Sequence, residues 1–210
     1  MTPRSTSILA GISYLIIFFT AIFANFLVLE TLHKNPLDTV QNHQILIGFG
    51  ICAFLATVVF DVIIAWALFI LYKSHLLSGL STLFRMMHAA IMATGLFALV
   101  RILDCTTETD ILNQLNIFNT IWLIGLFFFG IHLILLAYIL KRPKIIAVFL
   151  FLAGLMYVTD TVAHFMLPDY KTYSDLFLAL VAIPSIIGEL SFTIWLLIKG
   201  GKQLQKMSGS

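Results

Sequence analysis

Charged residues are scarce in this chain of 210 residues. Only 10% of them are Asp, Glu, Lys or Arg, whereas 60% are hydrophobic, and a soluble domain of ordinary composition has about 25% charged residues. So little charge excludes a disordered chain, an ordinary cytosolic enzyme and a nucleic-acid binder with a basic face. The mean hydropathy of +1.03 indicates an integral membrane protein whose surroundings are the lipid bilayer.

Cysteine and proline are rare as well. Cys52 and Cys105 form no C-x-x-C pair, so the sequence predicts two free thiols rather than a disulfide framework or a zinc ribbon. Three of the prolines, Pro36, Pro143 and Pro168, stand between apolar runs, where proline ends helices. Pro184 lies inside the last apolar run, and there it predicts a kinked helix.

Long apolar runs, by contrast, fill the chain. A helix needs roughly 20 mainly apolar residues to cross about 30 Å of hydrocarbon. Six runs meet this requirement: Ile8–Leu32, Ile45–Tyr72, Gly79–Leu103, Ile117–Leu140, Ile145–Leu167 and Ser174–Ile198. We therefore predict an all-α polytopic membrane protein, with one six-helix transmembrane domain over residues 1–200 and a polar tail over residues 201–210. The end of the tail resembles a cloning remnant and is set aside.

The connections between these runs differ in charge. One set, with both chain ends, contains no acidic residue and holds Arg4, Lys73, Lys141, Arg142, Lys144, Lys199, Lys202 and Lys206. The other set is largely acidic and holds Glu30, Asp38, Asp104, Glu108, Asp110, Asp169 and Asp175, with Lys34, Lys171 and Arg101. Because Lys and Arg concentrate in cytoplasmic loops, we expect a multi-pass protein of the cell membrane with both termini in the cytoplasm.

A few ionisable residues remain inside the predicted spans. An Asp, Arg or Lys at the centre of a helix costs roughly 2.5–3.5 kcal/mol on insertion scales, so such residues normally face the bundle interior and mark functional sites. Counted at 1.5 Å per residue, Asp61, His88, His132 and Glu189 fall at nearly one level, roughly 5 Å to the cytoplasmic side of the midplane, and Arg85 lies one turn away. We expect Asp61, Arg85, His132 and Glu189 to form one interior cluster that His88 adjoins.

Helical spacing supports an inward orientation of this layer. Ser81, Arg85 and His88 recur on one face of the third run, Thr57 and Asp61 on one face of the second, and Ser185, Glu189 and Thr193 on one face of the sixth. A second polar group, expected nearer the outer side, consists of Tyr157, Asp160 and His164 on one face of the fifth run. The i, i+4 spacing of Asp160 and His164 is typical of a local side-chain pair.

The polar layer has several interpretations. In the first it is structural: Arg85 neutralises Asp61 or Glu189, and the histidines bind neighbouring helices. In the second it binds or translocates a proton or a small solute, because buried carboxylates with histidines are the usual parts of proton relays. Between this function and a metal-dependent enzyme we favour the former, since an arginine and a proline-containing sixth helix accompany the carboxylates while no metal-ligand spacing is present.

Two cofactor hypotheses use the same residues. Asp61, His88, His132 and Glu189 are ligand types that suit zinc or iron, and a zinc-bound water could hydrolyse a lipid-like ester or amide. No H-E-x-x-H or comparable spacing supports this metal site. Haem between His88 and His132 is less favoured still, because one histidine per helix is more typical of packing than of axial ligation.

Two stretches resemble a known family. Gly130–Ile131–His132–Leu133, the Lys141–Lys144 loop and Ala153–Gly154–Leu155–Met156–Tyr157 are similar to bacterial multi-pass proteins catalogued as domain of unknown function 4386, as is Ile187–Gly188–Glu189–Leu190 with the run from Trp195 to Gly200. Arg85, His132, Glu189 and Asp61 match polar positions of the family's pattern, whereas His88 has no place in it. The resemblance implies a six-helix architecture, and no activity comes with it.

Overall fold

The computed structural model describes residues 1–140 and 142–201. Within these residues the chain is helical, without strands, and it contains six helical segments that are long and apolar enough to cross a membrane. The elements are α1 (Pro3–Ile22), η1 (Phe23–Leu29), α2 (Glu30–Lys34), α3 (Pro36–Asn42), α4 (Gln44–Tyr72), α5 (Ser78–Ile102), α6 (Glu108–Ile139), α7 (Lys144–Met166) and α8 (Tyr170–Ile198). The predicted all-α membrane architecture is confirmed. Of the expected tail, only Gly201 is among the described residues, and Lys141, Lys202 and Lys206 lie outside them.

Three helices begin well before the apolar runs that predicted them, and the first of them is α1, which begins at Pro3 rather than Ile8. Helix α6 begins at Glu108 rather than Ile117, and α8 begins at Tyr170 rather than Ser174. The Thr107 hydroxyl accepts a hydrogen bond from the backbone N–H of Asp110 and so caps the first turn of α6. Hydropathy marks the part of a helix that fits hydrocarbon, and a capped polar turn extends the helix beyond it.

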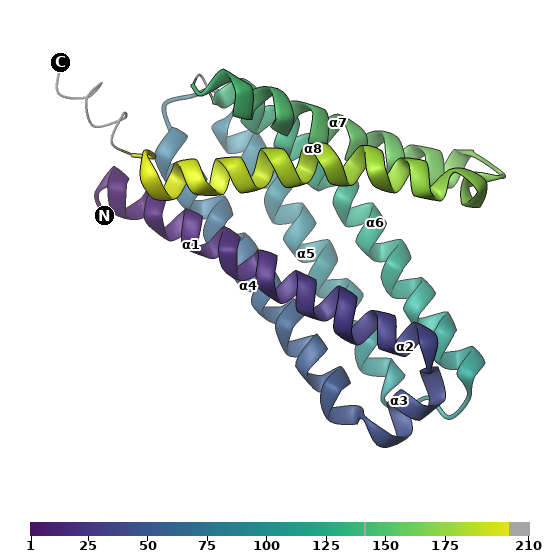
Figure 1. Cartoon of the computed structure of the whole chain (residues 1–210). Helices are drawn as coiled ribbons and strands as arrows, with labels where there is room; N and C mark the ends of the chain where they lie inside the picture. The colour runs from purple at the N-terminus through teal and green to yellow at the C-terminus, as the bar shows by residue number, and fades with distance from the viewer. Residues whose placement is uncertain (141, 202–210) are drawn as a thin grey trace, which may run out of the picture.

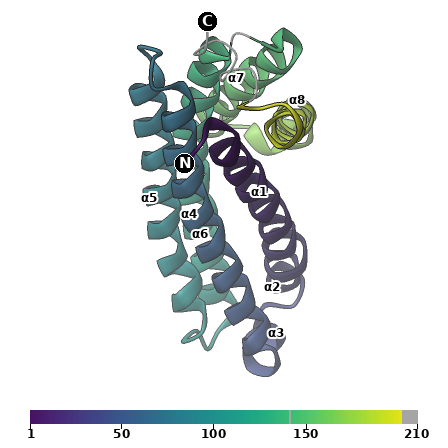
Figure 2. The same cartoon turned by 90° about the vertical axis from the view of Figure 1, so that its left-hand side faces the viewer.

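The six long segments form a ring in chain order. Each packs against its successor, and α8 closes the ring against α1. The segment α1–η1–α2 lies along α4, with α5 and α6 behind, whereas the α7–α8 hairpin crosses this group at a steep angle (Figure 1). Helices α1 and α8 meet near the chain termini and diverge from there, as the end-on view of α8 also shows (Figure 2). The opposite half of α8 packs on α7, and its apolar side chains Leu176, Leu178 and Ile183 are exposed in the isolated chain.

The first segment contains a π-helical turn at Phe23–Leu29, where the backbone N–H of Glu30 bonds to the Asn25 carbonyl. Val28 on this turn lies directly against Gly50 of α4, at a position where a Cβ atom would come within 2.6 Å of its side chain. Helix α8, in turn, runs through Pro184 without interruption. The π-helical turn and Pro184 therefore lie inside continuous helical segments, and the number of membrane-spanning segments among the described residues remains six.

Glycines set the crossing of α7 with its neighbours. A Cβ atom at Gly154 would lie 2.5 Å from the backbone oxygen of Gly130 in α6, and one at Gly188 of α8 would lie 3.0 Å from the backbone carbon of Phe149. Small residues allow such close helix–helix contact in lipid, where the hydrophobic effect does not drive association. The α7–α8 hairpin is thus attached to the bundle at backbone contact distance.

Polar contacts fix the end of α8 beside the start of α1. The Arg4 guanidinium donates to the carbonyl oxygens of Leu196, Leu197 and Gly200, and the Ser7 hydroxyl donates to the Leu196 oxygen at 2.8 Å. Leu196 and Leu197 belong to the last turn of α8, whose carbonyl oxygens lack intrahelical donors, and Gly200 follows the helix. The start of α1, the loop over residues 73–77, the start of α7 and the end of α8 lie at the same end of the bundle (Figure 1).

The glycine crossing gives a first prediction. Gly154→Ala should lower the free energy of unfolding by about 1–3 kcal/mol, because the new methyl group meets backbone rather than a movable side chain. Thermal unfolding in detergent measures the effect. Gly48→Ala is the matched control, since nothing lies within 4 Å of a Cβ atom there, and it should be neutral or slightly stabilising. Equal stability of the two variants would show that the close contact is unimportant.

The second prediction concerns orientation. We expect the end that carries both termini to be cytoplasmic, so a cysteine at Thr106 should react with an impermeant thiol reagent in intact cells, and one at Arg142 should not. Both substitutions require a Cys105→Ala background. Burial raises the pKa of the Cys105 thiol and slows its reaction, yet this thiol lies beside Thr106. Labelling at residue 142 and not at residue 106 would show that the orientation is the opposite one.

Candidate functional site

The largest fully buried side chain among the described residues is that of Arg85 on α5, with 1% of its surface exposed. Its Nη2 donates to Asp61 Oδ1 on α4 at 2.5 Å, and its Nη1 donates to the Tyr14 hydroxyl on α1 at 2.7 Å. The guanidinium carbon also lies 4.9 Å from the Tyr14 ring centre and 5.3 Å from that of Phe129 on α6. Four helices therefore meet at one cation, whose desolvation these contacts offset.

His132 on α6 completes the surroundings of the guanidinium. Its Nε2 lies 3.2 Å from Arg85 Nη1, and its Nδ1 lies 2.9 Å from the backbone oxygen of Ser81. Because guanidinium nitrogens can only donate, Nε2 must accept, and the proton of the ring is on Nδ1, which donates to the carbonyl. This geometry fits a neutral imidazole.

Asp61 faces two groups of α5. One oxygen binds Arg85, and Oδ2 lies 3.4 Å from Nε2 of His88. Three buried atoms of this group have no hydrogen-bond partner among the described residues, namely Asp61 Oδ2, Arg85 Nε and His88 Nδ1. Unsatisfied buried polar atoms are rare in native proteins, and they call for a functional or structural reason. We call Tyr14, Asp61, Arg85, His88 and His132 the Arg85 cluster.

Glu189 on α8 lies next to the Arg85 cluster without entering it. It is within electrostatic range of Arg85 and Asp61, yet no Lys, Arg or His nitrogen among the described residues is within 4.0 Å of its carboxylate. Tyr157 of α7 lies beside Glu189 and Ser185, and the buried Ser185 hydroxyl has no hydrogen-bond partner there. Glu189 is partly exposed, unlike Asp61 and Arg85.

The members of the expected outer group lie in two places. Tyr157 packs edge-on against Phe129, with ring centres 5.7 Å apart, and so borders the Arg85 cluster. Asp160 and His164 meet at Tyr170, the first residue of α8: the Tyr170 hydroxyl donates to Asp160 at 2.6 Å, and the rings of His164 and Tyr170 are 4.5 Å apart. Asp160 and His164 form no ion pair with each other in the described part of the chain.

The positions of the candidate ligands bear on the cofactor hypotheses. A metal site needs at least three of Asp61, His88, His132 and Glu189 to converge, and no such group occurs among residues 1–140 and 142–201. The Arg85 guanidinium lies between Asp61 and His132, with contacts to both. The Phe129 ring contacts both His88 and His132, at 4.9 and 5.9 Å between ring centres, where a bis-histidine haem would need open space. The residues present do not fit either group.

Sequence reasoning missed Tyr14, which binds Arg85 and contacts Phe192 of α8 edge-on, with ring centres 5.9 Å apart. A signal for it exists in the sequence. Ser7, Gly11 and Tyr14 recur at helical spacing in the first run, and all three are buried. A tyrosine on that small-residue face has its hydroxyl inside the bundle, where it needs a partner.

Six apolar helices around a buried arginine define a polytopic helical membrane protein. The family model described as "Domain of unknown function (DUF4386)" matches residues 9–200, and the chain belongs to this family. It is also 30% identical over 166 residues to an "Uncharacterized protein" of Archaeoglobus fulgidus, an alignment that covers 76% of this chain and 89% of the relative. No solved structure matches. The family resemblance drawn from the sequence is thus confirmed.

The Arg85 contacts give a third prediction. Arg85→Leu should lower the free energy of unfolding by about 3–5 kcal/mol, because it leaves the Asp61 carboxylate buried without its partner. Adding Asp61→Asn should restore part of the loss, and Glu189→Gln should restore less, since Asp61 binds the guanidinium and Glu189 does not. Thermal unfolding in detergent ranks the three proteins. Equal or absent rescue by both second substitutions would mean that Asp61 is not the principal partner of Arg85.

Proposed function

We propose that the protein binds a proton, or a small solute that carries positive charge, at Glu189, and that it moves this charge across the membrane. The observation that supports the proposal is the balance of charge around Arg85. The guanidinium is paired with Asp61 at 2.5 Å, and His132 is engaged as a neutral acceptor. Glu189 is therefore a second carboxylate beside a cation that is already neutralised.

A carboxylate without a counter-charge is costly in a medium of low dielectric constant, so it takes up a proton or attracts a cation. His88 is a second candidate position for the proton, because its Nε2 faces Asp61 Oδ2 at 3.4 Å. Either location gives the site one exchangeable positive charge. In a purely structural network, each buried carboxylate would instead be paired with a buried cation.

The position of Glu189 supports exchange with the surroundings. The contacts between α1 and α8 include those of Arg4 with the end of α8 and the Tyr14–Phe192 ring pair, and the two helices diverge with distance from the end that holds Arg4 (Figure 1). Glu189 lies about one turn from Phe192 along α8, on the side away from Arg4. The Glu189 residue is partly exposed in the isolated chain, while Arg85 and His132 are 1% exposed. Glu189 therefore lies between the surface of the bundle and the buried Arg85 cluster, with which it interacts electrostatically.

Proton flux into reconstituted vesicles tests the proposal. With an imposed membrane potential and a pH-sensitive dye inside, vesicles containing the parent protein should acidify faster than empty ones. Glu189→Gln removes the charge with little change of shape, and it should reduce the rate at least about tenfold, a range typical of lost proton-transfer groups. Its melting temperature should stay close to that of the parent, since Glu189 makes no ion pair.

Asp160→Asn is the matched control. It removes a carboxylate from another membrane-spanning helix, where Asp160 accepts from Tyr170 outside the Arg85 cluster, and it should leave the flux unchanged. The proposal for protons is wrong if the parent protein conducts none or if Glu189→Gln conducts as well as the parent. Loss of flux in Asp160→Asn as well would show that the requirement for a carboxylate is not specific to Glu189.

A further inference from the structure

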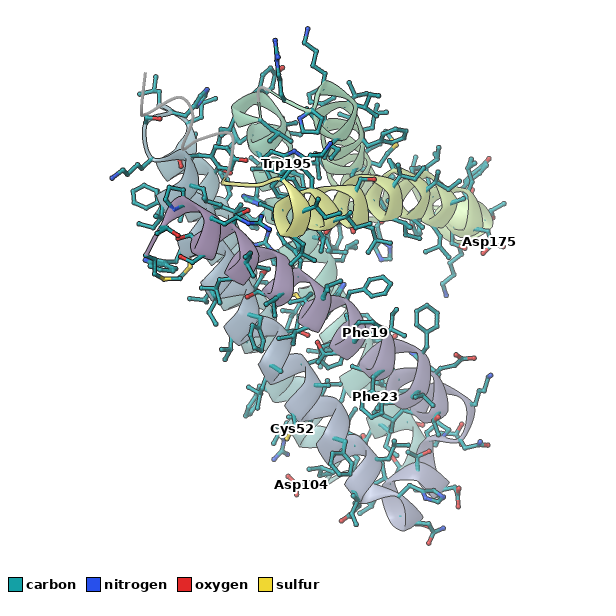
Figure 3. The ribbon with its side chains drawn as sticks, turned by 60° about the vertical axis from the view of Figure 1, so that its left-hand side comes forward. Phe19, Phe23, Cys52, Asp104, Asp175 and Trp195 are labelled. Carbon is teal, nitrogen blue, oxygen red and sulfur yellow. The ribbon has the colours of Figure 1, made fainter. Side chains whose placement is uncertain are left out.

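A basic pocket lies at the end of the bundle that carries the chain termini. It is bounded by Arg142, Pro143 and Lys144 at the start of α7 and by Trp195 and Lys199 at the end of α8. Arg142, Lys144 and Lys199 are exposed, and no acidic side chain lines the pocket. Trp195 lies at this end of α8, whereas Asp175 lies at the opposite end (Figure 3). Three positive charges, from a residue before α7, the first residue of α7 and the residue after α8, thus line one pocket that has no acidic side chain among the described residues.

The adjacent surface has the opposite character. An apolar groove between the end of α6 and the start of α7 is lined by Ala137, Tyr138, Leu140, Ala147, Val148, Phe151 and Leu152, and Lys144 borders both this groove and the basic pocket. From Lys144 to Leu152 the groove follows α7 for about 12 Å. Tyr138, Val148 and Leu152 are 63%, 55% and 40% exposed. The basic pocket and the apolar groove together form an amphipathic surface, as the charged headgroup and the apolar chains form an amphipathic lipid.

We propose that this surface is a binding site for an anionic phospholipid. The phosphate lies in the basic pocket between Arg142, Lys144 and Lys199, with the Trp195 indole beside it, and one acyl chain follows the groove past Val148 to Leu152. Basic pockets between helices bind anionic headgroups, and tryptophan is the residue that favours headgroup depth. The stem of Lys144 lies along the apolar groove while its ammonium group reaches the phosphate.

Convergence distinguishes this surface from basic residues that only set orientation. Lys73 is an exposed basic residue at the same end of the bundle, yet it lies in the loop after α4 and does not line the pocket. Arg4 is likewise excluded, because its guanidinium binds the carbonyl oxygens at the end of α8. Positive charge alone therefore does not identify the site. The site is identified by Lys144, which lines both the basic pocket and the apolar groove.

Lipid binding to the purified protein tests the proposal. Dioctanoyl phosphatidylglycerol, added in detergent, should raise the melting temperature and appear as a bound lipid in native mass spectra, and the matching phosphatidylcholine should bind far more weakly. About fivefold in affinity is expected for each basic side chain near a headgroup. The triple variant Arg142→Gln, Lys144→Gln, Lys199→Gln should therefore need on the order of 100-fold more phosphatidylglycerol, and Lys73→Gln should bind like the parent.

A second variant tests the groove separately. Val148→Trp fills the acyl path without changing charge and should weaken phosphatidylglycerol binding. Equal binding of the anionic and zwitterionic lipids, or equal loss in the triple variant and in Lys73→Gln, would overturn the site. Inorganic phosphate that binds as tightly as the lipid, together with an unchanged Val148→Trp variant, would assign the pocket to a free anion instead. Proton flux does not enter these measurements, so the result is independent of the function proposed for Glu189.

Discussion

The ion pair between Arg85 and Asp61 is the constraint on which the arrangement of the bundle depends. An arginine inside hydrocarbon is tolerated only when its charge is paired and lipid is excluded. Tyr14, Asp61 and His132 supply those partners from α1, α4 and α6, so three helices must approach α5 at one level. The Phe129 ring closes the remaining side of the guanidinium. If one of these helices moved away, a buried charge would lose its partner. The cost of an unpaired buried charge therefore restricts the packing of the helices far more than apolar contact does.

The α7–α8 hairpin is held by a different principle. Its crossing with α6 depends on Gly130 and Gly154, which meet at backbone distance, and its own two helices meet at Gly188. Close van der Waals packing allows a steep crossing, so the hairpin joins the ring at one end while its other end diverges from α1 (Figure 1). Glu189 lies where these two regimes meet. Its carboxylate is near the buried pair and does not bind the guanidinium.

Several features of this structure could be predicted from sequence, because they depend on local patterns. Hydropathy located six spans, and helical spacing placed Ser81, Arg85 and His88 on one buried face. Helix ends were wrong where capped polar turns continue a helix, as at Thr107. The partner of Arg85 could not be chosen, since depth alone gives Asp61 and Glu189 equal standing. Tyr157 was grouped with Asp160 and His164, but the glycine crossing of α7 turns it toward Phe129, and no local pattern encodes a crossing angle.

Helix α8 connects the parts of this protein that the two proposals concern. Trp195, at the basic pocket, stacks on Phe192 with ring planes 13° apart. Phe192 meets Tyr14, and the Tyr14 hydroxyl accepts from Arg85. Because these contacts are continuous and α8 is unbroken, a shift of its end changes the Tyr14–Phe192 contact and also moves Glu189, which lies about one turn away on the same helix. Arg4 and Ser7, which hold the last carbonyls of α8, oppose such a shift. The charge exchange that we propose at Glu189 would then depend on what holds or releases that end of α8.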